Sequence, residues 1–193
     1  MPGPKYQRQL YDFAFEHDGL IHIIEVKKNG IPPQRVRQLA HRGQLERLAH
    51  GLYRLENFPA DPRRQALWFA LLWPQGSGDR NIYPRLTHHT ALALHGLTDA
   101  VVDVIDVTLP LGTRIRRSDW PRDVHYHFKD LAEKDAEVID GFPVTTVRRT
   151  LLDCARDGVD ARFVREATDE AVRLGRADLS TVSHVNEILD ART

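Results

Sequence analysis

Apolar residues recur at helical spacing in three short stretches near the start of the chain. Residues 5–19 carry apolar side chains three and four positions apart and end at a glycine, which predicts an amphipathic helix. Residues 22–30, HIIEVKKNG, predict a second short helix with Ile23 and Ile24 facing the core and Val26 as a further candidate for that face. Residues 32–43, PPQRVRQLAHRG, predict a third, because proline suits a first helical turn and glycine suits a helix end.

The third helix separates an apolar stripe from a polar face. Val36, Leu39 and Ala40 lie at positions i, i+3 and i+4, so we expect them to face the core. The open face then carries polar side chains, namely Gln34, Arg35, Arg37, Gln38, His41 and Arg42. Residues 45–55, LERLAHGLYRL, alternate around a small turn and predict a β-hairpin. Three short helices followed by a hairpin are typical of a winged helix-turn-helix.

The remainder of the chain mixes helical and strand patterns. We expect helices over 61–73 and 86–97, strands over 104–110 and 123–128, a hairpin over 136–146, and final helices over 147–158, 160–175 and 178–191. Two prolines and a change of pattern place a boundary near residue 58, between a domain 1–58 and a domain 59–193. The predicted fold class is α+β, with an N-terminal winged helix-turn-helix followed by a mixed α/β domain that has a small sheet and C-terminal helices.

The composition is that of a folded globular protein. The chain has 193 residues, of which 41% are hydrophobic and 28% are charged. Its longest apolar stretch, residues 66–73, is far shorter than the roughly 20 residues that span a membrane, and the N-terminus lacks a signal-peptide pattern. Cys154 is the only cysteine, so no intrachain disulfide can form. These features lead us to expect a cytoplasmic protein with no membrane partner.

The charges are unevenly distributed although the net charge is zero. Residues 1–54 hold nine basic and five acidic residues, a net charge of +4, and the remainder holds 18 basic and 22 acidic residues, a net charge of −4. A basic N-terminal domain favours a polyanionic partner. Together with the polar face of the third helix, this asymmetry predicts binding to double-stranded DNA.

The predicted DNA-binding residues fall into two groups. Arginine can form paired hydrogen bonds to guanine and glutamine to adenine, so the third helix would read bases through Gln34, Arg35, Arg37 and Gln38. Lys27, Lys28, Arg42, Arg47 and Arg54 would contact phosphates, and His50 on the hairpin would reach a phosphate or the minor groove. The competing interpretation is that these side chains only solvate a surface helix.

Four blocks of sequence resemble one known family. Residues 36–55, VRQLAHRGQLERLAHGLYRL, resemble the winged helix-turn-helix of the AbiEi-type antitoxins, which belong to bacterial toxin–antitoxin pairs whose toxins are nucleotidyltransferases. Three further blocks match in order and spacing, namely LTHHTALALHGL (86–97), VIDVTLP (104–110) and GFPVTTVRRTLLDCA (141–155). The resemblance therefore covers nearly the whole chain.

The resemblance implies an antitoxin with two roles and no enzymatic activity. The first domain would bind inverted repeats in its own promoter and repress transcription, with a monomer in solution and two copies on the DNA. The second domain would neutralise the cognate nucleotidyltransferase toxin, directly or indirectly. An ordinary transcription regulator that senses a ligand and has no toxin partner is the first alternative.

A metal-dependent nuclease is the second alternative, because Glu25-x-Lys27 matches the tripeptide that holds a metal and a phosphate in such enzymes. That chemistry needs a strand and a second acid on a neighbouring strand. Asp18, the nearest acid upstream of Glu25, is too close in sequence for two strands and a turn, and Asp12 lies within the first predicted helix. We therefore expect Glu25 to face water.

The remaining candidate chemistry is sparse. His88-His89 and His125-x-His127 could bind zinc, but the spacing offers no third ligand, so we expect surface or packing roles and no metal. We expect Cys154 to pack as a small buried apolar group. The chain has no Walker loop, glycine-rich fingerprint or serine nucleophile elbow. We therefore predict no catalytic residue and no cofactor.

Overall fold

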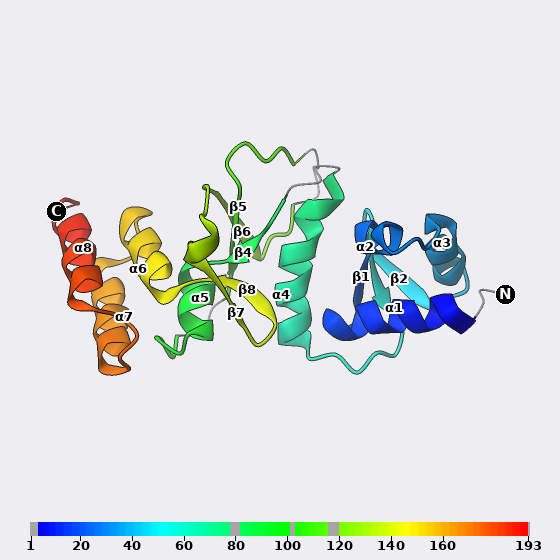
Figure 1. Ribbon diagram of the computed structural model, residues 1–193, viewed down its shortest axis with the longest axis horizontal. Helices are drawn as coiled ribbons and strands as arrows, with labels where there is room; N and C mark the ends of the chain where they lie inside the picture. The colour runs from blue at the N-terminus through cyan, green and yellow to red at the C-terminus, as the bar shows by residue number, and fades with distance from the viewer. Residues whose placement is uncertain (1–3, 78–81, 101–102, 116–119, 193) are drawn as a thin grey trace. The chain divides into compact units, whose positions relative to one another are not determined.

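The computed structural model describes residues 4–77, 82–100, 103–115 and 120–192. Its internal contacts divide the chain into two compact units, Met1–Ile82 with Thr113–Asp119, and Tyr83–Gly112 with Trp120–Thr193. We call these the N-terminal unit and the C-terminal unit. The fold is mixed α+β, with a winged helix-turn-helix followed by an α/β part, so the predicted fold class is confirmed (Figure 1).

Short helices around a three-stranded sheet form the N-terminal unit. Its elements are α1 (Pro4–Glu16), β1 (Leu20–His22), α2 (Ile23–Lys28), α3 (Pro33–His41), β2 (Leu45–Ala49), β3 (Leu52–Leu55), α4 (Pro62–Leu72) and the 3-10 helix η1 (Trp73–Ser77). The strands are antiparallel in the order β1-β3-β2. Gly51 closes the predicted hairpin with a φ of 77°, and a Cβ at this position would lie 2.8 Å from Cγ2 of Ile23, so both backbone and space require glycine.

The core of the N-terminal unit lies between α1, the sheet, α2 and α3. Val36 and Leu39 are buried, as their spacing in α3 predicts. In α2 the fully buried residue is Val26, whereas Ile23 and Ile24 are half-buried. Val26, the further candidate for the inward face, is thus the most deeply buried residue of this helix, and the two isoleucines are only partly covered.

Helix α4 packs within the N-terminal unit. The Asp18 carboxylate receives a hydrogen bond from Nε of Arg64 at 3.1 Å, and the Gln65 side chain donates to the carbonyl of Asp18 at 2.8 Å. Trp68 in α4 packs edge-on against the ring of His17. By these contacts the N-terminal unit extends past residue 58, and a functional division at that residue stays a prediction.

A five-stranded mixed sheet with helices forms the C-terminal unit. Its elements are β4 (Arg85–Leu86), α5 (His88–Leu94), β5 (Ile105–Leu109), β6 (Val124–Phe128), the 3-10 helix η2 (Glu133–Asp135), β7 (Ala136–Ile139), β8 (Phe142–Thr145), α6 (Val147–Arg156), α7 (Ala161–Arg173) and α8 (Leu179–Asp190). The strand order is β6-β5-β4-β8-β7, and β5 and β6 run parallel. The parallel pair puts residues of two distant segments side by side.

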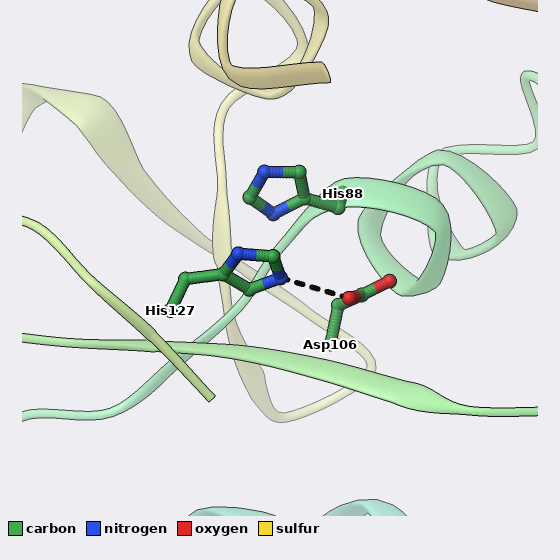
Figure 2. Close-up of side chains that lie close together, drawn as sticks. All are labelled: His88, Asp106 and His127. Carbon is green, nitrogen blue, oxygen red and sulfur yellow. Dashed lines mark hydrogen bonds and ion pairs between the residues drawn. The ribbon is translucent and has the colours of Figure 1, made fainter. Parts of the chain in front are cut away.

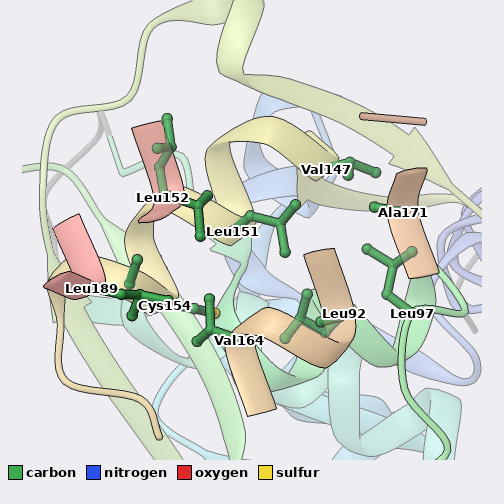
Figure 3. Packing of buried hydrophobic residues seen from close by; sticks show 12 residues of the cluster. Leu92, Leu97, Val147, Leu151, Leu152, Cys154, Val164, Ala171 and Leu189 are labelled. Carbon is green, nitrogen blue, oxygen red and sulfur yellow. The ribbon is translucent and has the colours of Figure 1, made fainter. Parts of the chain in front are cut away.

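Helices α5 to α8 share one apolar core. Figure 3 shows that Leu92, Leu151, Val164 and Leu189, one from each helix, converge in this core. Cys154 lies among them with no exposed surface, and burial raises the pKa of its thiol far above the ordinary value. The prediction that Cys154 packs as an apolar group is confirmed. Over the described residues, none of the helices is both long and apolar enough to cross a membrane.

Candidate nucleic-acid interface

The polar face of α3 points away from the core of the N-terminal unit. Pro33 occupies the first turn of the helix, where a missing N–H costs nothing, and Val36 and Leu39 hold the opposite face inward. Gln34, Arg37 and Gln38 are consequently exposed, and Arg35 is half-buried. Nη1 of Arg35 donates a hydrogen bond to Oε1 of Gln38 at 3.2 Å. This bond helps to hold the two predicted base-reading side chains in position.

A groove of about 650 Å³ lies beside α3, and we call it the interface groove. It is bounded by α2, α3 and the β2–β3 hairpin. Five of the ten predicted DNA-binding residues line it, namely Lys27, Gln34, Arg37, Arg47 and His50. Exposed His41 also lines the groove, although it was not among the ten residues. The sequence pattern places His41 on the open face of the helix, and this position could have identified it as a candidate DNA contact.

The other predicted phosphate contacts differ in whether another side chain already pairs with them. Lys28 and Arg42 are exposed, at the ends of α2 and α3. Arg54 instead forms an ion pair with Glu46, the residue opposite it on β2. Because this pair occupies its guanidinium, Arg54 has the weakest claim to a phosphate contact among the predicted anchors. Which of the ten residues contact DNA stays a prediction.

Glu25 does not face water, so that expectation is wrong. Its carboxylate is half-buried, with Oε2 3.6 Å from Nδ1 of His17. Burial raises the pKa of the Glu25 carboxyl, and nearby His17 only partly opposes this rise. Residues 23–28 form a helix rather than a strand, and Asp18 is paired with Arg64. The strand-borne pair of acids that a nuclease of this type needs is not formed here.

Replacing Glu25 with glutamine is expected to raise the melting temperature of the N-terminal unit at neutral pH by a few degrees. A carboxyl whose pKa rises on folding favours the folded state below its ordinary pKa, 4.5, and this contribution is lost as pH rises through the raised value. Glutamine carries no charge, so the Glu25→Gln variant does not lose this stability as the pH rises. The gain should therefore be larger at pH 7 than at pH 4 when melting is followed by circular dichroism. A gain that is equal at both values would contradict the argument.

The segment that contains this groove matches a known family. Residues 8–55 match the family described as transcriptional regulator, AbiEi antitoxin. These residues make up about a quarter of the chain, and over them the protein is similar to that family. The match includes α2, α3 and the hairpin and leaves the C-terminal unit outside. The family resemblance predicted from the sequence is therefore confirmed over residues 8–55, which include the winged helix-turn-helix.

A solved structure extends the likeness in fold. The RV2827C protein from Mycobacterium tuberculosis has a TM-score of 0.53 at 18% sequence identity, over 97% of this chain and 77% of that chain. At this identity the likeness concerns the fold alone. No curated protein matches the sequence.

The C-terminal unit holds a cluster that the sequence pattern does not reveal. His88 and His127 lie close to Asp106, a carboxylate that is 5% exposed on β5. The spacing along the sequence offers no third ligand for the histidine pairs, whereas the structure brings Asp106 close to both His88 and His127. The one signal in the sequence was an acid inside an otherwise apolar strand, VIDVTLP.

Proposed function

We propose that this protein is the antitoxin of a bacterial toxin–antitoxin system. It represses its own operon by binding promoter inverted repeats through the N-terminal unit, and it neutralises a nucleotidyltransferase-type toxin through the C-terminal unit. The observation that carries the proposal is the exposed polar face of α3 beside the hairpin, within the segment that matches the AbiEi family.

The dimensions of α3 suit the reading of bases. Its nine residues make a helix about 13 Å long, which fits a major groove about 12 Å wide. Gln34 and Arg37 project from this helix into the interface groove and can reach base edges. The hairpin beside the helix carries Arg47 and His50, which suit the phosphate backbone. One copy of the protein on each half of an inverted repeat completes the proposed complex.

A mobility-shift titration tests the DNA-binding part of the proposal. One duplex spans the region upstream of the protein's own gene, and a second duplex has the same length and base composition in scrambled order. We expect tighter binding to the first duplex. Equal affinity for both duplexes would leave only non-specific binding and overturn the proposed repression.

Co-expression with the product of the adjacent gene tests the antitoxin part. If that product arrests growth, the full chain should restore growth when it is expressed together with it. A chain that binds the upstream duplex and fails to restore growth would be a transcription regulator without a toxin partner. The two assays therefore separate the two halves of the proposal.

Salt is expected to weaken DNA binding steeply. Lys27, Lys28, Arg42 and Arg47 would each release counterions from phosphates, so raising NaCl from about 50 mM to about 200 mM should reduce affinity about 100-fold. Arg47→Ala should lower the slope of log affinity against log salt by about one, whereas Arg54→Ala, which removes a guanidinium already paired with Glu46, should barely change it. A flat salt response would contradict the phosphate contacts.

A further inference from the structure

Four histidines gather around one buried carboxylate in the C-terminal unit. The carboxylate of Asp106, on β5, accepts hydrogen bonds from Nε2 of His127 at 2.9 Å and from Nδ1 of His89 at 3.3 Å. His125 Nδ1 lies 3.7 Å from the same carboxylate. The ring of His88 stacks on the ring of His127, with centroids 3.8 Å apart. Figure 2 shows His88 and His127 beside Asp106.

Three of these side chains bring possible ligand atoms close together. One ring nitrogen of His88, one ring nitrogen of His127 and one carboxylate oxygen of Asp106 all lie within 4.8 Å of one another. They come from α5, β6 and β5, which hold them in place from three directions. Two ligands of a tetrahedral zinc ion lie about 3.3 Å apart. The His127 and Asp106 atoms, at 2.9 Å, would therefore need to move by only a few tenths of an ångström.

We propose that His88, Asp106 and His127 form a binding site for one divalent transition-metal ion of the zinc class. Two imidazoles and a carboxylate suit zinc, cobalt or nickel, whereas magnesium and calcium prefer all-oxygen ligands. Such an ion would tie α5 to the neighbouring strands β5 and β6. The test of this site involves neither DNA nor toxin.

The surroundings of the cluster fit a metal site in two respects. A pocket of about 460 Å³ is lined by these histidines and Asp106, so an ion and a water molecule have access. His88 Nε2 lies 3.0 Å from Oδ2 of Asp157, and its Nδ1 lies 3.0 Å from the Thr87 hydroxyl. An ion that binds His88 replaces one of these contacts, and the other remains to orient the ring. A histidine ligand held by a carboxylate or hydroxyl is the usual arrangement around protein metals.

The competing explanation is that the histidines only satisfy the buried Asp106 carboxylate by hydrogen bonding. Two of them, His127 and His89, already donate to its two oxygens. On this explanation Asp157 and Thr87 hold the His88 ring, and the cluster shows no saturable uptake of metal. Titration of the full, untagged chain with zinc therefore separates the two explanations.

The experiment uses protein freed of metal by a chelator and titrated calorimetrically with Zn²⁺, with Co²⁺ as a spectroscopic probe and Mg²⁺ as the ion expected not to bind. We expect one Zn²⁺ per chain, a visible absorption band from bound Co²⁺, and a higher melting temperature with Zn²⁺. Asp106→Asn and His127→Gln should each weaken Zn²⁺ binding about 100-fold. His184→Gln, which changes an exposed histidine on α8, should leave the affinity unchanged.

Two outcomes would overturn the site. The first is a wild-type chain that takes up no Zn²⁺ in a saturable manner. The second is Zn²⁺ affinity that stays the same in both Asp106→Asn and His127→Gln, which would place any binding at other histidines. Circular dichroism of each variant establishes that it is folded, and the wild-type titration decides the matter even if the Asp106 variant is unstable.

Discussion

The double substitution of Arg35 and Arg37 by alanine is expected to weaken binding to the upstream duplex by at least about 100-fold and to leave the fold intact. Each paired hydrogen bond from arginine to guanine contributes about 1–3 kcal/mol of discrimination, so the loss of two should remove most specific affinity. Neither side chain is buried in the core: Arg37 is exposed in the interface groove, and Arg35 is half-buried beside Gln38. Fluorescence anisotropy against the upstream and scrambled duplexes measures the change.

A matched control removes the same charge from the C-terminal unit. Arg162 and Arg173 lie on α7, where each pairs with a glutamate on the same helix, so Arg162→Ala with Arg173→Ala also removes two cations. If the control weakens DNA binding equally, total charge rather than α3 determines affinity. If Arg35→Ala with Arg37→Ala keeps its affinity, α3 does not read the operator. Growth rescue by the α3 variant should be retained, because the substitutions lie outside the C-terminal unit.

The longer helices of the C-terminal unit could be predicted from the sequence because their signals are local. Helices α6, α7 and α8 each bury one apolar stripe and begin at a capping side chain, namely Thr146, Asp160 and Asp178. A cap and a stripe need only neighbouring residues, so periodicity alone locates them. The polar face of α3 beside the interface groove could be predicted in the same way, from the periodicity of one short helix.

Two strands, β1 and β4, could not be predicted from the sequence because each pairs with strands that are distant along the chain. Strands β1 and β4 have only three and two residues, too few for an alternating pattern. Strand β1 pairs with β3, more than 30 residues later in the chain, and β4 joins β5 to β8. Such short segments become strands because partners elsewhere complete their hydrogen bonds, which the local sequence does not record.

Side-chain partnerships were the least predictable part of both candidate sites. The parallel register of β5 and β6 sets Asp106 opposite His125 and within reach of His127, and α5 brings His88 to the same place. In the N-terminal unit, the hairpin register sets Arg54 opposite Glu46, and the ion pair between them occupies a guanidinium that was predicted to contact phosphate. Spacing along the chain identifies candidate side chains, whereas register and packing decide which of them meet.

A buried ion-pair network in the C-terminal unit leads to the second large prediction. Asp153 on α6 is fully buried, and it accepts hydrogen bonds from Nε of Arg149 at 2.7 Å and from Nζ of Lys129 at 2.9 Å. Each cation also has a second carboxylate, Asp135 for Arg149 and Asp157 for Lys129. The network therefore joins α6 to the loop after β6 and to the turn η2.

Asp153→Ala is expected to lower the free energy of unfolding of the C-terminal unit by about 3 kcal/mol. Removing one partner of a buried ion pair costs about 3–5 kcal/mol, and the lower end applies because Arg149 and Lys129 each keep a second carboxylate. The higher helix propensity of alanine offsets only about 0.5 kcal/mol of this loss. Denaturant unfolding followed by circular dichroism measures the change, and amide hydrogen exchange over α6 to α8 assigns it to the C-terminal unit.

An exposed ion pair on α7 supplies the comparison for this prediction. Arg162 and Glu166 lie 3.5 Å apart with side chains 88% and 65% exposed, so water and salt screen their attraction. Glu166→Ala should therefore change the free energy of unfolding by no more than about 0.5 kcal/mol. The contrast between the two variants separates burial from charge as the cause. If Asp153→Ala costs no more than Glu166→Ala, the buried network does not stabilise α6, and apolar packing alone must hold that helix in place.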